Sequence, residues 1–190
     1  MRSVRVTIMV LLGSLREGSI NRQLVETAVE SAPTEVDLQL FDRIGELPFY
    51  NEDIDTQDAP EPVMALRAAA AEAAAALVAT PEYNGTIPAV LKNAIDWLSR
   101  PWGNGALKGK PLVVVGVARG RYGGSWAHDE TRKSFGIAGA KVLDEVRLST
   151  PTEVLGGLHP RENRELATAL RSVVEKLVVE AAERGLPPSR

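Results

Sequence analysis

Five short apolar segments, separated by stretches with helical spacing, constrain the fold of this chain more than any other feature. The apolar segments are Val4–Leu12, Val36–Phe41, Ala76–Thr80, Leu112–Ala118 and Val142–Leu148. The helical patterns are Asn21–Ala32, Val63–Ala75, Pro88–Ser99, Ser125–Phe135 and Arg161–Arg184. Apolar strands that alternate with helices are typical of parallel sheets buried on both faces. The pattern therefore predicts an α/β fold with a doubly wound, five-stranded parallel sheet, for which two strand orders remain open.

Length and composition fit a single domain, residues 1–190, and narrow the class of function. A net charge of −3 argues against a nucleic-acid partner, which requires clustered Lys and Arg. The apolar run Val6–Leu12 is too short for a secretory core or a membrane span, so we expect a cytoplasmic protein. No metal site is predicted, because the chain lacks cysteine and its two histidines, His128 and His159, are far apart.

The loop after the first predicted strand, residues 13–21, is rich in groups that bind phosphate. It leads into a helix, whose free backbone N–H groups and positive dipole end favour an anion. Ser14 and Ser19 add hydroxyl donors, Asn21 adds an amide donor, and Arg16 adds a forked positive charge. The loop lacks the glycine spacings of triphosphate and dinucleotide sites, which favours a terminal monophosphate. The alternative is a polar turn in which Ser19 or Asn21 caps the helix.

The loop after the third predicted strand contains two prolines, Pro81 and Pro88, that hold it stiffly. Such a loop can present backbone N–H groups to the edge of a flat ring, with Tyr83 packed nearby. The alternative is a connecting turn in which Asn84 and Gly85 adopt positive φ angles. The residues alone favour neither interpretation.

Glycines and arginines alternate after the fourth predicted strand. Gly120, Gly123 and Gly124 permit a close approach of the backbone to a ligand. Arg119 and Arg121 could contact a phosphate, for instance on a pyridine nucleotide. For the arginines alone, a flexible surface turn with solvated charges is the favoured interpretation.

Three segments together resemble the NADPH-dependent FMN reductase family, which includes quinone, chromate and azo-dye reductases. They are G-S-L-R-E-G-S-I-N at 13–21, T-P-E-Y-N-G-T-I-P-A-V-L-K-N-A-I-D-W at 80–97, and G-R-Y-G-G at 120–124. The second segment is the most specific, and the resemblance extends from the first strand to about Gly124. It implies a flavodoxin-like fold that binds FMN at the carboxyl ends of the parallel strands.

The resemblance also assigns roles to individual residues. Ser14, Arg16, Ser19, Ile20 and Asn21 match the FMN-phosphate loop, Pro81, Glu82, Tyr83 and Asn84 match the loop along the isoalloxazine ring, and Gly120, Gly123 and Gly124 match glycines near the other flavin edge. It implies a homodimer or homotetramer with flavin near the subunit interface. We expect the dimer contact on the helix Pro88–Ser99, with Trp97 at its end, and core packing is the alternative. Ala118-Arg119 stands where smaller or neutral residues are expected, which affects nucleotide or acceptor preference.

The implied activity is electron transfer from NADPH or NADH, through FMN, to a quinone, an azo compound, a metal oxyanion or free flavin. The cofactor would supply the chemistry, so no catalytic side chain is predicted. Two alternatives remain open: a non-enzymatic electron carrier of the flavodoxin kind, and an enzyme that holds a nucleotide or sugar phosphate without flavin. Carriers are usually strongly acidic, and this chain is only weakly so.

Several residues near these loops have no assigned role. The Glu82 side chain is expected to face solvent or a partner chain. Tyr50, Asn51 and Glu52, in the long segment 42–62, either cover the flavin of a neighbouring subunit or belong to a mobile surface loop. His128 is expected to be a solvated helix residue.

Overall fold

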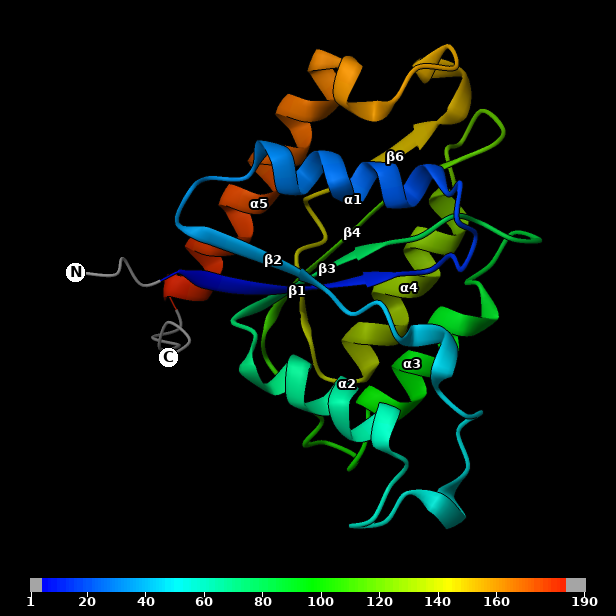
Figure 1. Ribbon diagram of the computed structural model, residues 1–190, viewed down its shortest axis with the longest axis vertical. Helices are drawn as coiled ribbons and strands as arrows, with labels where there is room; N and C mark the ends of the chain where they lie inside the picture. Colours follow the sequence, from blue (N-terminus) through cyan, green and yellow to red (C-terminus); the bar gives the residue numbers. More distant parts are fainter. Residues whose placement is uncertain (1–4, 184–190) are drawn as a thin grey trace.

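A parallel sheet with helices on both faces runs through residues 5–183, the part of the chain that the computed structural model describes (Figure 1). Its strands are β1 (Val6–Leu12), β2 (Val36–Leu40), β3 (Ala75–Ala79), β4 (Pro111–Ala118), β5 (Lys141–Val142) and β6 (Leu148–Pro151). The α-helices are α1 (Ile20–Ser31), α2 (Glu61–Glu72), α3 (Ala89–Leu98), α4 (Ser125–Ile137) and α5 (Arg164–Glu183). Four short 3-10 helices complete this described part: η1 (Ile44–Glu46), η2 (Glu52–Ile54), η3 (Thr152–Leu155) and η4 (Pro160–Glu162).

The strand order is β2-β1-β3-β4-β5, and every strand pair in it is parallel. This order distinguishes the flavodoxin-like sheet from the other doubly wound order left open by the sequence. The chain reverses its winding direction between β1 and β3, so the loops after these two strands open a crevice at their carboxyl ends. The predicted fold class is confirmed.

Two hydrophobic layers cover the sheet, and alternate residues of β1 contribute to each. Ile8, Val10 and Leu12 pack on the side of α1 and α5. Met9 and Leu11 pack on the side of α2, α3 and α4. Figure 1 shows the same division, with α1 and α5 on one side of the sheet and α2 and α3 on the other. All five side chains are almost completely buried, as expected for a central parallel strand.

The prediction of a single fifth strand over Val142–Leu148 was wrong. The chain pairs with β4 first through β5, leaves its edge over residues 143–147, and pairs again through β6. Beside this gap the buried Arg132 Nη2 donates to the carbonyl of Val114 on β4 at 3.1 Å. The Arg132 side chain thereby ties α4 to the middle of β4.

Two predicted helix boundaries differ from the structure by three residues. The alanine-rich helix ends at Glu72 rather than Ala75, because the last alanines enter the buried strand β3. The final helix begins at Arg164 rather than Arg161, because His159 caps the separate turn η4. The predicted end of that helix, Arg184, lies outside the described residues.

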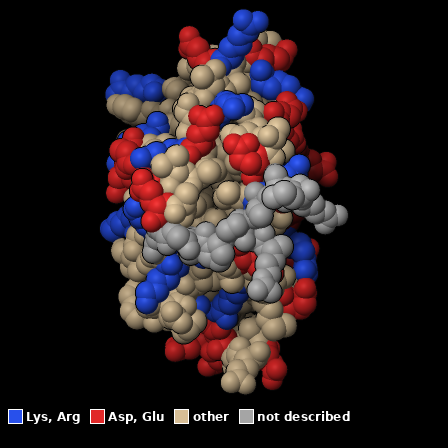
Figure 2. Space-filling model, turned by 90° about the vertical axis from the view of Figure 1, so that its left-hand side faces the viewer, with Lys and Arg blue, Asp and Glu red and all other residues tan. Residues whose placement is uncertain are grey.

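The end of the molecule at which the strands begin presents mixed charges. In Figure 2 lysine and arginine side chains are interspersed with aspartate and glutamate, without a large patch of one sign. The described residues of this face therefore form no basic patch of the kind on which nucleic-acid binding depends. Among the described residues, no helix combines the length and the apolar character that a membrane crossing requires.

Candidate functional site

A cleft of about 510 Å³ lies among the loops that follow β1, β3 and β4. Its walls are formed by Ser14, Arg16, Ser19, Ile20, Asn21, Pro81, Glu82, Tyr83, Val117, Ala118, Arg119 and Thr152. Both the volume and the position beyond the strand ends are typical of a cofactor site. The structure thus brings the first predicted loop together with Pro81, Glu82 and Tyr83. The other predicted residues, Asn84, Gly120, Gly123 and Gly124, do not line the cleft.

The first loop presents several donors that are unused within the described part of the chain. Ser19 occupies the N-cap position of α1, but its side chain makes no capping hydrogen bond, and the first turn contains no acidic residue. Arg16 is exposed and forms no ion pair with any residue of the described segment 5–183. Ser14 is buried and accepts a long hydrogen bond of 3.4 Å from the Arg16 amide. Such an end of a helix suits an anion with several oxygens.

The Asn21 side chain makes a structural contact within the chain and is not a free donor. Its amide nitrogen donates to the Val117 carbonyl at 2.8 Å, and its amide oxygen accepts from the Val117 N–H at 2.9 Å. Val117 lies two residues beyond Val115, whose carbonyl accepts from Thr80 just past the end of β3. The Asn21 side chain therefore continues the hydrogen bonding where β3 has ended, and it ties α1 to β4 under the cleft.

The loop after β3 turns tightly, as the connecting-turn interpretation predicted. Asn84 and Gly85 adopt φ angles of 53° and 75°. Tyr83 and Thr86 exchange two backbone hydrogen bonds of 3.2 and 3.1 Å across this turn. The turn points Tyr83 outward, with 49% of its surface exposed, at the rim of the cleft. The turn and the cleft wall are therefore formed by the same loop.

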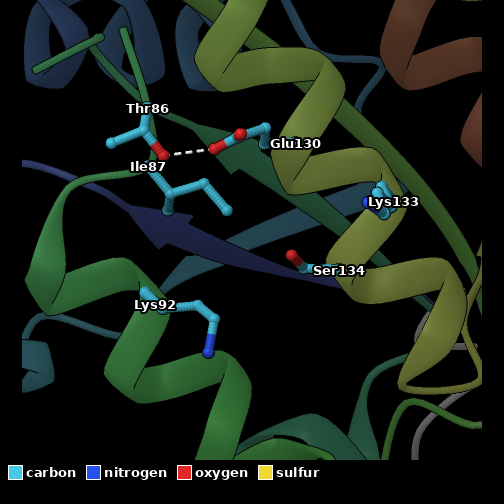
Figure 3. Close-up of a pocket in the computed structure, with 6 residues that line it drawn as sticks. All are labelled: Thr86, Ile87, Lys92, Glu130, Lys133 and Ser134. Carbon is cyan, nitrogen blue, oxygen red and sulfur yellow. Dashed lines mark hydrogen bonds between the residues drawn. The ribbon is translucent and has the colours of Figure 1, made fainter. Parts of the chain in front are cut away.

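Helix α4 forms hydrogen bonds with this loop at two positions. The Glu82 carboxylate accepts a hydrogen bond of 3.1 Å from the Ala127 N–H in the first turn of α4. Thr86 donates to the carboxylate of Glu130, one turn later, beside a small cavity of about 260 Å³ between α3 and α4 (Figure 3). The Glu82 side chain is thus engaged within the chain, contrary to the expectation that it faces solvent or a partner.

His128 was expected in solvent, and this expectation was wrong, because its side chain is 0% exposed. It belongs to the stripe of α4 that faces the sheet, which also contains the buried Thr131 and Arg132. Burial lowers the pKa of His128 below its usual value, and the nearby Arg132 charge adds to this effect, while the hydrogen bond with the Thr80 carbonyl opposes it. The polar members of the stripe hid this buried face from the sequence pattern.

The glycine-rich loop after β4 makes a close contact with β6. Gly120, Gly123 and Gly124 have φ angles of 86°, 57° and 86°, in the left-handed region. A Cβ at residue 123 would lie 2.6–2.7 Å from backbone atoms of residues 149–151. The close approach that Gly123 and Gly124 permit is therefore to the chain itself, whereas a Cβ at Gly120 would have no neighbour within 4 Å. Of the two arginines, Arg119 lines the cleft, whereas Arg121 donates to the Tyr122 hydroxyl.

The long segment between β2 and α2 is held against α3. Trp97 Nε1 donates to the Pro48 carbonyl at 2.8 Å, and the Asn93 amide oxygen accepts from the Tyr50 N–H at 2.8 Å. Trp97 is 0% exposed, so the expected dimer contact through this side chain is replaced by core packing. Beyond these anchors, the cyan segment with η2 extends away from the sheet in Figure 1, and Phe49 is 83% exposed.

Two residues of the cleft wall had no signal in the sequence. Val117 is placed there because β4 continues three residues past its last pairing with β3, at Val115. Thr152 follows β6, in the final third of the chain, where no motif was found. Only the pairing of β6 with the end of β4 brings Thr152 to the site.

Comparison with known proteins agrees with this geometry. Residues 6–153 match the family model described as NADPH-dependent FMN reductase. A quinone reductase of Pseudomonas putida is 40% identical over 151 residues, which cover 80% of this chain and 78% of that protein. A 2-hydroxy-1,4-benzoquinone reductase of a Burkholderia species is 42% identical over 125 residues, 66% of this chain and 67% of that protein.

A solved structure is similar over nearly the whole chain. It is the flavoenzyme FerB of Paracoccus denitrificans, described as an NAD(P)H:(acceptor) oxidoreductase. The two chains are 31% identical with a TM-score of 0.82, over 94% of this chain and 98% of FerB. The similarity includes the final third of the chain, in which no sequence motif was found.

Proposed function

The chain belongs to the NADPH-dependent FMN reductase family, and from this premise we propose that it uses bound FMN to pass electrons from NADPH or NADH to a quinone. Azo compounds, metal oxyanions and free flavin are further candidate acceptors. The observation that carries the proposal is the cleft itself, which joins an unused anion site at the start of α1 to a stiff loop with an exposed tyrosine. The relatives are reductases, so an enzyme is favoured over an electron carrier.

The residues of the first loop fit the phosphate of FMN. Arg16 would form a charge-assisted contact, and the hydroxyls of Ser14 and Ser19 would donate to phosphate oxygens together with the N-terminal amides of α1. Ile20 lines the same wall with its apolar side chain. Asn21 would act indirectly, by holding α1 against β4.

The loop after β3 fits the edge of a flat ring system. Pro81 and Tyr83 offer apolar surface, and the Glu82 backbone N–H forms no hydrogen bond within the described residues. When bound, FMN would supply the redox chemistry, accepting hydride from the nucleotide and giving electrons to the acceptor. A fixed N–H donor at the ring edge would stabilise the negative charge of the reduced state. No side chain needs to act as an acid or a base in this scheme.

The pyridine nucleotide would approach from the side of Arg119. This side chain is exposed on the cleft wall, so it is available to a nucleotide phosphate. Arg121 is engaged with Tyr122, its guanidinium carbon lying 4.5 Å from the ring centroid. We therefore assign the phosphate contact to Arg119 rather than Arg121, for either NADPH or NADH.

We also propose a cytoplasmic homodimer or homotetramer. Several large apolar side chains are exposed: Trp126 at 58% beside Gly85 of the loop after β3, Phe49 at 83% on the long segment, and Trp102 at 67% in the loop after α3. Exposed apolar surface of this kind supports association with further copies of the chain. The interface would then enclose the cleft opening, as expected for a flavin near a subunit boundary.

An absorption spectrum tests the proposed function directly. The purified protein is incubated with FMN, desalted, and treated anaerobically with NADPH or NADH, followed by a benzoquinone. The proposal predicts retained flavin bands that bleach with the nucleotide and return with the quinone. Retained bands without bleaching would indicate an electron carrier. A colourless protein would contradict FMN binding and leave the first loop as a site for another phosphate.

A further inference from the structure

His128 joins three separate parts of the chain next to the loop after β3. It lies on α4, its Nε2 is 2.9 Å from the carbonyl oxygen of Thr80, and its Nδ1 is 2.6 Å from the hydroxyl of Ser149 on β6. Neither the proposed binding of FMN nor the proposed electron transfer uses this side chain. The loop after β3, residues 80–88, is called the ring loop here because it would lie along the flavin ring. A buried histidine with two defined partners at its start requires a separate explanation.

The two partners determine the protonation state of the ring. A carbonyl oxygen can only accept, so Nε2 must carry a proton and donate to Thr80. In the neutral ring Nδ1 is then an acceptor, and the Ser149 hydroxyl donates to it. Burial favours this neutral form by lowering the pKa of His128. The ring is thus a fixed N–H donor directed at one carbonyl group.

Two glycines leave the space that this hydrogen bond occupies. A Cβ at residue 116, in the middle of β4, would lie 2.1 Å from the Thr80 carbonyl oxygen and 2.5 Å from His128 Nε2. A Cβ at residue 124 would lie 3.2 Å from the same nitrogen. Larger residues at position 116 are therefore incompatible with the contact. The neighbouring elements are shaped around the bond between α4 and Thr80.

Thr80 is the residue at which the chain leaves the sheet and enters the ring loop. Its N–H still donates to Val115 in the ladder at 3.1 Å, whereas its carbonyl turns toward α4. Its hydroxyl donates to the Pro81 carbonyl at 3.0 Å, which restrains the next peptide. The orientation of the Thr80 carbonyl therefore sets the direction in which Pro81 and the Glu82 backbone N–H face the cleft.

We propose that His128 is a positioning residue of the flavin site, which holds the Thr80 carbonyl so that the Glu82 backbone N–H faces the ring edge. This inference rests on the proposed function, because it assigns a role in tuning the cofactor. Loss of the Nε2 donor would let the loop shift while the phosphate end of the cleft stays intact. The reduced flavin would lose stabilisation, and its binding through the phosphate would change little.

A matched pair of variants separates the two ring nitrogens. In His128→Gln the side-chain amide can place its N–H near the position of Nε2 and still reach Thr80. In His128→Asn the shorter amide reaches only the position of Nδ1, on the Ser149 side. Both replacements are neutral and polar, so they differ mainly in the Thr80 hydrogen bond. His159→Gln, on the other histidine in an exposed turn, serves as the control.

The readouts are the flavin midpoint potential, the Kd for FMN, and the rate of flavin reduction by NADPH in stopped flow. We expect His128→Asn to lower the potential and to slow reduction about tenfold, with the Kd for FMN changed less than about threefold. His128→Gln and His159→Gln should stay within about twofold of the unsubstituted protein. Equal behaviour of the Asn and Gln variants would overturn the proposal.

A measurement on the unsubstituted protein remains decisive if a variant does not fold. The ¹⁵N chemical shifts of the imidazole nitrogens should show a neutral His128 ring protonated at Nε2 at neutral pH. A ring protonated at Nδ1, or charged, would overturn the proposal. If the unsubstituted protein itself fails to retain FMN or to bleach with NADPH, the proposed function fails instead, so the two failures are distinguishable.

Discussion

The two ends of the cleft are built in opposite ways. At the phosphate end, the groups that would contact a ligand belong to one loop. Within residues 5–183 the Ser19 hydroxyl makes no capping hydrogen bond and Arg16 has no ion-pair partner. At the ring end, the loop after β3 is engaged at Thr80, Glu82 and Thr86 with a helix more than forty residues further along the chain. The first end is open to a ligand, and the second is already fixed before a ligand binds.

Because of this difference, the first end should determine the affinity for the ligand, and the second should determine the stability of the loop and the properties of the bound ring. Free, charged donors gain their interactions only when the anion binds. Substituting them should therefore change the affinity for the ligand without changing the stability of the fold. A loop fixed by internal hydrogen bonds is preorganised, so its substitutions should change stability and the properties of the bound ring. Each prediction below tests one side of this division.

The largest effect is expected for Gly116→Ala. The new methyl group would overlap the Thr80 carbonyl and the His128 ring, which both belong to the fixed end. Overpacking at a buried position should lower the free energy of unfolding by about 3 kcal/mol. Denaturant unfolding measures this loss. Gly120→Ala is the control, since its Cβ would have no neighbour within 4 Å, and only the cost of its left-handed backbone should remain.

At the open end, Arg16→Ala should weaken FMN binding by about 1.5–3 kcal/mol, which is roughly 10–150-fold in Kd. The unfolding free energy of the protein without FMN should stay the same, because Arg16 forms no ion pair within the described residues. Fluorescence titration of FMN gives the affinity. Arg22→Ala, which removes a nearby, partly exposed arginine paired with Asp42, is the matched control. An unchanged Kd would exclude Arg16 from the site.

The open end was predictable from the sequence because its determinants are local. The run of serines and Arg16 between a strand and a helix indicated an anion site without any knowledge of distant residues. The apolar segments likewise indicated β1 to β4 within about two residues, since strands buried on both faces have a strong composition signal.

The fixed end was not predictable, because its determinants are tertiary. Nothing near His128 in the sequence indicates that its ring faces Thr80, and a polar stripe on α4 resembles a solvated face. The last strand is split because the chain pairs with β4 first at Lys141–Val142 and again at Leu148–Pro151, which no local pattern encodes. Trp97 could be a core residue or a contact residue until its neighbours were known.

A smaller effect is expected for Glu82→Ala. The Ala127 N–H in the first turn of α4 would lose its acceptor, together with a favourable charge at the positive end of the helix. The loss of such a cap should lower the free energy of unfolding by about 1 kcal/mol, with little change in FMN affinity. Glu82→Gln keeps an acceptor and should recover part of the loss. A large change in affinity without a change in stability would place Glu82 with the open end instead.

The smallest effect is a pH dependence of stability that arises from His128. Burial holds the His128 ring neutral in the folded protein. In the unfolded protein the same ring is protonated once the pH falls below its usual pKa of 6.5. The unfolded state then carries more protons, so this contribution is complete above pH 6.5 and is lost as the pH falls toward the lowered folded pKa. Arg132 enhances the shift, and Glu82 and Asp129 oppose it. Unfolding curves between about pH 7.5 and pH 5 should show a shallower slope in His128→Gln than in His159→Gln. Equal slopes would mean that His128 titrates normally, and the fixed end would then lack its neutral donor.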